Sequence, residues 1–169
     1  MEENQDNKLE FKRKLIDFYN LNKSKIFIFA IFLLIILIST IFIKYNNERK
    51  NIRIAEKYMK AGIFLSSNQK DNAKVLYEEI ILSKNKFYSI LALNTIIEKE
   101  IIENDEIVLN YFKILEDINY SEEKLDLITF KKALYLLKSS KNQEGKKLLN
   151  NLIEKDSKLK FLAKEAINN

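Results

Sequence analysis

The sequence predicts an all-α protein in which one N-terminal transmembrane helix is followed by a stack of antiparallel helical hairpins. Three observations predict this class. Residues 26–43 form an apolar run without charge, Gly or Pro. After this run, apolar residues recur at spacings of three and four, which is the period of amphipathic helices. The 169 residues include no Pro and two Gly, too few for the frequent turns of an all-β fold.

The apolar run has the length of a membrane span. A helix of 18 residues, from Ile26 to Ile43, is about 27 Å long, close to the thickness of the hydrocarbon core of a bilayer. Lys25 precedes the run, and Lys44 and Tyr45 follow it. Long cationic side chains and Tyr suit the two interfaces, so both flanks fit a single span.

Two other interpretations of this run are weaker. A cleaved signal peptide needs a short basic start and a small-x-small cleavage site, whereas here 25 residues precede the run and no such site follows. A buried core helix usually keeps a polar stripe, and this run holds only Ser39 and Thr40. We therefore expect an integral membrane protein.

The positive charges on the two sides of the span are nearly balanced, so they barely distinguish its two possible orientations. Residues 11–25 and 44–58 each contain five Lys or Arg, so the positive-inside rule favours neither orientation of the span. Short tails follow charge more closely than long domains do, which favours a cytoplasmic N-terminus. The chain then divides into a basic tail (1–25), the span (26–43) and a helical domain (44–169).

The tail itself has an amphipathic pattern. Phe11, Leu15 and Phe18 fall on one face of a helix, beside the basic residues 12–14. This pattern suits an interfacial helix on an anionic leaflet, and the alternative is a helix that binds a partner protein.

Composition argues against most catalytic classes. The chain has no Cys and no His, which excludes a thiol nucleophile and a Cys/His zinc site. Its two Gly are too far apart to form a phosphate loop. Glu78–Glu79 and Glu122–Glu123 occupy ordinary surface positions. We expect no enzyme activity, no cofactor, no metal and no small-molecule substrate. The net charge is +5, but the basic and acidic residues are interspersed and the excess reflects a general richness in Lys. Because no basic patch stands out, we expect no nucleic-acid partner.

Polar breaks between the apolar stretches predict the helix boundaries. The expected helices cover 5–24, 24–67, 70–83, 86–103, 106–118, 121–140, 143–156 and 158–167. Helix 86–103 is apolar almost all round, which places it in the middle of the domain. Asp105 and Ser121 stand where N-capping residues are expected.

Small residues recur with the spacing of a helical repeat. Ala61 and Ala73 are twelve residues apart, and Ala133 and Gly145 repeat that spacing 72 residues later. Tetratricopeptide (TPR) units of about 34 residues place small residues at such positions, where their two helices cross closely. Ala92 could mark a middle unit, but its counterpart falls in a predicted loop. The pattern predicts a degenerate TPR-like stack.

The order of these features resembles a known family. A basic, aromatic tail at residues 11–19 precedes the span and the TPR-like helices, and residues 87–93 read Phe-Tyr-Ser-Ile-Leu-Ala-Leu. This arrangement resembles the ancillary SecYEG translocon subunits, the YfgM-like proteins. The resemblance implies a bacterial inner-membrane protein with a cytoplasmic N-terminus and a periplasmic domain. It also implies contacts with the Sec translocon or with periplasmic chaperones that handle exported proteins.

Stacked hairpins form a concave surface from the first helix of each pair, and such a surface can hold a segment of another protein. The repeat register gives six candidate partner-binding residues: Tyr58, Leu65, Ser89, Ile96, Phe130 and Leu137. The alternative is that several of them are core or simply solvent-facing residues. Tyr58 is the strongest candidate, because core packing does not require its hydroxyl.

These features favour a membrane-anchored interaction module that assists protein export. The alternative is a structural scaffold subunit of another inner-membrane complex, for example in cell division or respiratory assembly, in which the span makes the contacts. A membrane-bound hydrolase that uses only carboxylates is a third hypothesis.

Overall fold

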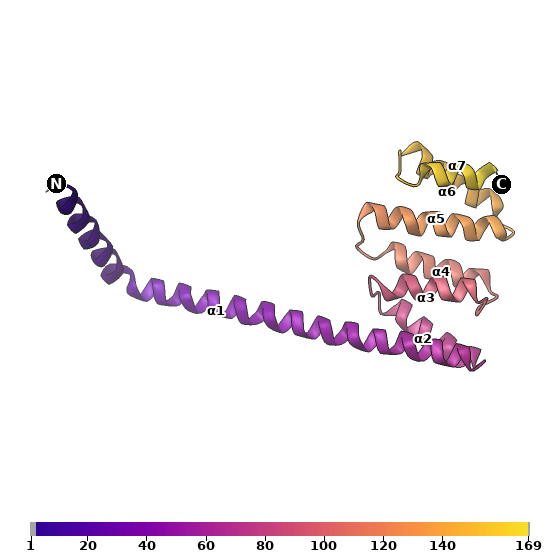
Figure 1. The fold of residues 1–169 in the computed structure, drawn as a ribbon, viewed down its shortest axis with the longest axis horizontal. Coiled ribbons are helices and arrows are strands. Elements are labelled where there is room, and N and C mark those ends of the chain that lie inside the picture. Colours follow the sequence, from indigo (N-terminus) through magenta and orange to yellow (C-terminus); the bar gives the residue numbers. More distant parts are fainter. Residues whose placement is uncertain (1–2, 169) are drawn as a thin grey trace. The chain divides into compact units, whose positions relative to one another are not determined.

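The structure, a computed structural model, describes residues 3–168, leaving aside the side chains of residues 3–10, Leu15 and Ala30. The described chain is helical and contains no strands, so the all-α prediction is confirmed. It divides into two compact units at Lys50 and Asn51. The helices are α1 (Glu3–Ser66), α2 (Lys70–Leu82), α3 (Tyr88–Glu98), α4 (Asp105–Glu116), α5 (Glu122–Lys138), α6 (Asn142–Glu154) and α7 (Lys160–Asn168) (Figure 1).

The first unit consists of the N-terminal part of α1. The prediction of a separate tail helix over 5–24 is wrong, because α1 runs unbroken from Glu3 to Ser66. No Gly or Pro lies near residue 24, where the break was expected, and the Asn22 side-chain amide donates to the Phe18 carbonyl oxygen, 3.0 Å away, within the helix. The side chain of Leu15, predicted to lie on the apolar face of the tail, is outside the described residues.

Helix α1 is long and apolar enough to cross a membrane. All described side chains of residues 26–43 are exposed, so the helix presents apolar surface on every side. The Thr40 hydroxyl donates to the Leu37 carbonyl oxygen at 2.8 Å and is therefore satisfied within the helix. Such a continuous apolar surface needs an apolar cover, as a lipid bilayer supplies.

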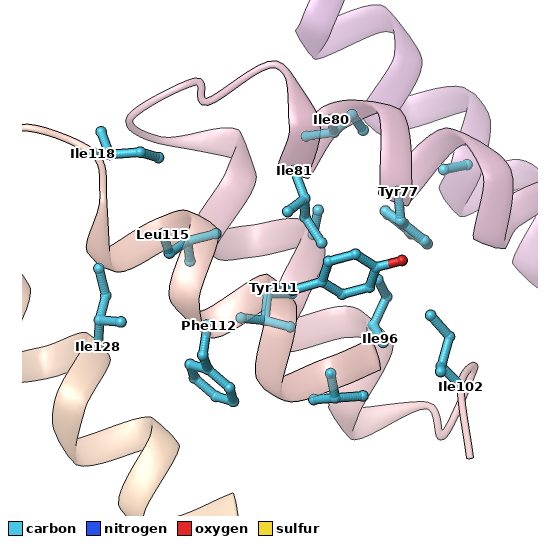
Figure 2. Packing of buried hydrophobic residues seen from close by; sticks show 14 of the residues in the cluster. Tyr77, Ile80, Ile81, Ile96, Ile102, Tyr111, Phe112, Leu115, Ile118 and Ile128 are labelled. Atoms are coloured by element: carbon cyan, nitrogen blue, oxygen red, sulfur yellow. The ribbon is translucent and has the colours of Figure 1, made fainter. Parts of the chain in front are cut away.

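The second unit is built from helical hairpins. Helix α2 packs mainly on α3, α4 contacts α2, α3 and α5, and α6 packs between α5 and α7. The main core of this unit gathers side chains from α2, α3, α4 and α5, including Tyr77, Ile81, Ile96, Phe112 and Ile128 (Figure 2). The end of α1 joins the same core through Ala61 and Tyr58, whose ring meets Tyr77 of α2. Helix α3 contacts both α2 and α4, as expected for the most apolar helix of the domain.

Helix α3 ends earlier than the predicted 86–103, at Glu98. Glu100 adopts a left-handed φ of 47°, and its N–H donates to the Ile97 carbonyl oxygen at 3.3 Å. The Ile101 N–H donates to the Ile96 carbonyl oxygen at 3.0 Å, which completes a Schellman motif. The motif turns Ile101 back toward the core, so the apolar run of the sequence continues past the end of α3.

Left-handed residues end other helices in the same way. Asn68 (φ 58°) and Asp156 (φ 56°) also form the two hydrogen bonds of a Schellman motif, and Lys84 (φ 54°) follows α2 with one. A side chain costs about 1 kcal/mol or more in this region, and Gly is the usual residue there. None of these positions carries Gly, so the usual sequence signal of a helix end is missing.

The predicted N-caps are partly wrong. Asn104, not Asp105, caps α4, because its side-chain oxygen accepts from the N–H groups of Glu106 at 2.9 Å and Ile107 at 3.3 Å. Ser121 does occupy the N-cap position of α5, but its hydroxyl makes no capping hydrogen bond. Asp105 is instead the first helical residue, which frees its carboxylate for another helix.

The small residues are buried, and one pair of them lies where two helices cross. Ala61, Ala73, Ala133 and Gly145 are all buried. A Cβ on Gly145 would stand 2.8 Å from the Ala133 carbonyl oxygen and 3.0 Å from the Leu137 nitrogen. The backbones of α5 and α6 are therefore in direct contact, as the spacing of small residues predicted.

The 72-residue offset extends to whole helices. Helix α2 covers residues 70–82 and α6 covers 142–154, so both ends are shifted by 72. Helices α3 and α7 begin at residues 88 and 160, again 72 apart. Helices of matching position thus recur at an interval of 72 residues along the second unit.

The two glycines should respond oppositely to substitution by Ala. Gly145→Ala should lower the free energy of unfolding by about 1–2 kcal/mol, because its Cβ meets backbone atoms of α5. Gly62→Ala should raise it by about 0.5–1 kcal/mol, because nothing lies within 4 Å of the added Cβ and Ala is the better helix former. Urea unfolding of the full chain in detergent micelles, followed by helical circular dichroism, measures both. Equal effects would contradict the close crossing of α5 and α6.

Glu100→Gly should stabilise the protein. Gly adopts a left-handed φ without steric cost, so we expect a gain of about 0.5–1 kcal/mol after the greater entropy of the unfolded chain is counted. The control is Glu165→Gly, inside α7, which should be destabilising by about 1 kcal/mol. The same urea titration applies, and a loss of stability in Glu100→Gly would argue against the left-handed turn.

Candidate binding groove

The second unit contains an open groove of about 790 Å³. Helices α3, α5 and α7 supply most of the lining, and the start of α6 completes it. The lining residues are Asn94, Ile97, Glu98, Lys131, Leu134, Tyr135, Leu137, Lys138, Asn142, Lys146, Ala166 and Ile167.

Helix α5 supplies the floor of the groove. Lys131, Leu134, Tyr135 and Lys138 follow the i, i+3, i+4, i+7 pattern, so they share one face of the helix. The two lysines are two turns apart, about 10 Å along the helix axis. The floor is therefore apolar at its centre and carries a cationic side chain at each end.

Tyr135 is fixed in place from behind. Its hydroxyl donates to the Asp105 carboxylate of α4 at 2.5 Å, and its ring packs against Phe112 with a centroid separation of 6.0 Å. Burial, and then the neighbouring Asp105 carboxylate, raise the pKa of the Tyr135 hydroxyl above its ordinary value of 10. The ring is thus a rigid part of the floor.

The lysines of the groove are not engaged within the protein. Lys131, Lys138 and Lys146 form no ion pair with any residue that the structure describes. By contrast, Lys132, the next residue on α5, pairs with Glu116 of α4 at 2.9 Å.

The lining has an excess of positive charge. Three lysines face a single carboxylate, that of Glu98, at the end of α3. The groove is therefore electropositive and free to accept carboxylates from outside.

A buried polar contact positions the wall that α7 provides. Asp126 of α5 is 5% exposed and accepts from both the Lys155 ammonium and the Ser157 hydroxyl. These two residues form the turn that leads from α6 into α7. The contact holds that turn against α5, and so places Ala166 and Ile167 along the groove.

Two of the six predicted partner-binding residues are inaccessible. Ser89 and Ile96 are both fully buried. The Ser89 hydroxyl donates to the Ile80 carbonyl oxygen of α2 at 2.9 Å, which satisfies it inside the core. These two residues are therefore core residues, as the alternative interpretation allowed, and neither can contact a partner directly.

Tyr58 and Leu65 also pack against the main core. The Tyr58 ring meets Tyr77 edge-on at 5.7 Å, and its hydroxyl shares a 3.2 Å hydrogen bond with the Thr95 hydroxyl of α3. The expectation that core packing leaves the Tyr58 hydroxyl free is therefore wrong.

Phe130 and Leu137 belong to a second apolar cluster, together with Ala133, Leu149 and Leu152. Both are partly exposed, and Leu137 also lines the groove. Leu137 is thus the candidate that the structure brings to the groove.

The groove residues missed from the sequence lie one position away from the candidates. Ile97, Lys131 and Lys138 line the groove, and each directly follows a candidate residue. One residue is a rotation of about 100° on a helix, which separates a core-facing position from a groove-facing one. Lys131, Leu134 and Lys138 share one helical face that combines basic and apolar side chains. Such a mixed stripe is typical of a partly exposed surface, and it is the sequence signal that could have found this face.

Comparisons with protein families, with curated proteins and with solved structures found no match to this chain. The resemblance to ancillary translocon subunits therefore stays a prediction from the residues. Within the part of the chain that the structure describes, no group of three or more Asp and Glu side chains is placed to hold a metal ion.

Tyr135→Phe should reveal the raised pKa of this tyrosine. Because the folded-state pKa lies above the unfolded value of 10, the hydroxyl stabilises the fold fully below pH 10 and loses its effect as the pH rises through the folded pKa. At pH 7 we expect the variant to be about 1 kcal/mol less stable.

The difference should shrink as the pH rises above 10, by up to about 1.4 kcal/mol per pH unit. Urea unfolding of both proteins at each pH measures it, since deprotonation of lysines is common to both. A constant difference between pH 8 and pH 11 would contradict the buried contact with Asp105.

Proposed function

We propose that this chain is a membrane-anchored, TPR-like interaction module whose groove binds a segment of another protein. The observation that carries the proposal is the groove itself, with its rigid apolar floor and its unpaired lysines. A helix long and apolar enough to cross a membrane belongs to the same chain and would act as the anchor. The proposal assigns no catalytic step and no cofactor.

The repeated hairpins support the TPR-like assignment. Helices α2 and α6, which would belong to the first and third hairpins, are 72 residues apart. This interval is about twice the length of a TPR unit. Small buried residues recur with the same offset, at Ala61 and Ala73 and again at Ala133 and Gly145. A stack of this kind presents the first helix of each hairpin on its inner face, which suits peptide binding.

We further propose that the module works beside the Sec translocon or with periplasmic chaperones. This part rests on the resemblance of the tail, span and residues 87–93 to ancillary SecYEG subunits. It requires an inner-membrane protein with a cytoplasmic N-terminus and a periplasmic domain.

A scaffold role is the second candidate. The second-unit part of α1 carries exposed apolar side chains at Ile52, Met59 and Ile63, spaced by seven and four residues on one face. Such a face suits lateral contact with another helix in a cell-division or respiratory complex. Met59→Lys with Ile63→Lys tests this face, because the groove-based function should survive the change and a scaffold that uses the face should fail. Exchange of residues 26–43 for an unrelated span tests in the same way a scaffold in which the span makes the contacts.

Photo-crosslinking in native membranes tests the groove-based function. A photoreactive residue at Leu134, in the groove, should crosslink to one defined protein partner, whereas the same residue at Lys147, exposed on α6 outside the groove, should not. Mass spectrometry identifies the crosslinked protein. The same weak, heterogeneous products from both positions would argue against a binding groove.

Labelling of a single cysteine tests the topology. The chain has no Cys, so Gln143→Cys, at an exposed position of α6, gives a unique site. An impermeant maleimide should label it in cells whose outer membrane alone is permeabilised. If labelling requires disruption of the inner membrane, the domain is cytoplasmic and the translocon-associated role fails.

A further inference from the structure

We propose that the segment bound in the groove is an acidic amphipathic helix, with an apolar stripe flanked by carboxylates about two turns apart. This inference rests on the proposed function and deepens it by stating the chemistry of the partner. The charge, the shape and the dimensions of the lining each support it.

The unpaired lysines define the charge of the partner. A segment that covers Leu134 and Tyr135 removes water from the neighbouring ammonium groups of Lys131 and Lys138. Each ammonium then needs a counter-charge, since a partly buried cation without one is costly. Acidic residues on the partner supply this charge, whereas a basic segment would be repelled.

The spacing and volume of the groove fit about two turns of helix. Lys131 and Lys138 are seven residues apart on α5, so carboxylates at i and i+7 of a helix lying along α5 could meet both. Two turns of helix, taken as a cylinder 10 Å wide, occupy about 850 Å³. The groove of about 790 Å³ is open to one side and so can hold most of such a segment.

The apolar floor favours a protein segment over a phosphate-bearing ligand. Ile97, Leu134 and Tyr135 offer apolar surface at the centre of the groove, where a lipid headgroup or a nucleic-acid backbone would need cations.

A peptide-display selection on the full chain, held in phosphatidylcholine nanodiscs, tests this inference. The probe is a library of random 16-residue peptides, with protein-free nanodiscs as counter-selection. The expected result is enrichment of sequences that combine a helical apolar stripe with Asp or Glu seven positions apart. Binding of an enriched synthetic peptide should weaken when the salt concentration is raised from 0.05 M to 0.5 M, because salt screens exposed charge pairs.

Charge reversal inside and outside the groove gives matched variants. Lys131→Glu with Lys138→Glu should weaken binding of the acidic peptide by about tenfold or more. Lys147→Glu with Lys164→Glu has the same net charge but changes exposed lysines outside the lining, so binding should stay within about twofold. Leu134→Gln should also weaken binding, since Leu134 lines the groove and belongs to neither apolar cluster. Circular dichroism confirms that each variant is folded.

The outcomes separate this inference from the proposed function. Enriched peptides that are neutral or basic overturn the inference, as does binding that both double variants weaken equally. Competition by short-chain phosphatidylglycerol without enrichment of acidic peptides would assign the groove to a lipid headgroup and also overturn it. If a protein still crosslinks specifically at Leu134 in these cases, the proposed function stands and only the chemistry of the partner is wrong. If neither crosslinking nor selection succeeds, both fail.

Discussion

The close approach of α5 and α6 is the constraint on which the groove and its surroundings depend. Backbone atoms of α5 lie within contact distance of the position that a Cβ on Gly145 would take, so this crossing tolerates no side chain. Ala61 and Ala73, the other pair with this spacing, are both fully buried. Beside the crossing, helices α3, α5 and α7 and the start of α6 line one open groove.

Polar contacts between the hairpins then fix the surfaces that the crossings create. Tyr111 of α4 donates to the Glu78 carboxylate of α2 at 2.8 Å, and Tyr135 of α5 donates in the same manner to Asp105 of α4. The buried carboxylate of Asp126 holds the turn before α7. The groove lysines take no part in these contacts, so charged groups divide between structural pairs and unpaired cations that line the groove.

The sequence was informative wherever periodicity or side-chain size carried the signal. It predicted the all-α class, the long apolar segment, the approximate positions of the helices and the small residues at the crossing of α5 and α6. It failed where the chain uses unusual residues for ordinary geometry: Glu100 and Asp156 take left-handed conformations that Gly usually marks, so the end of α3 was placed too late. Of the candidate residues, Ser89 and Ile96 are buried in the core. Ile96 and Ile97 are alike in sequence, so only packing decides which of them faces the core.

The central claim is that the close crossing of α5 and α6 holds the groove open as a preformed surface. The most direct test is a distance measurement by electron paramagnetic resonance between spin labels at Glu98→Cys of α3 and Lys164→Cys of α7, in a chain that has no other cysteine. We expect one narrow distance distribution in the otherwise native protein and a broad or shifted one when Gly145→Leu is added. A broad distribution without the Gly145 change, or a narrow one that this change leaves unaltered, would contradict the account.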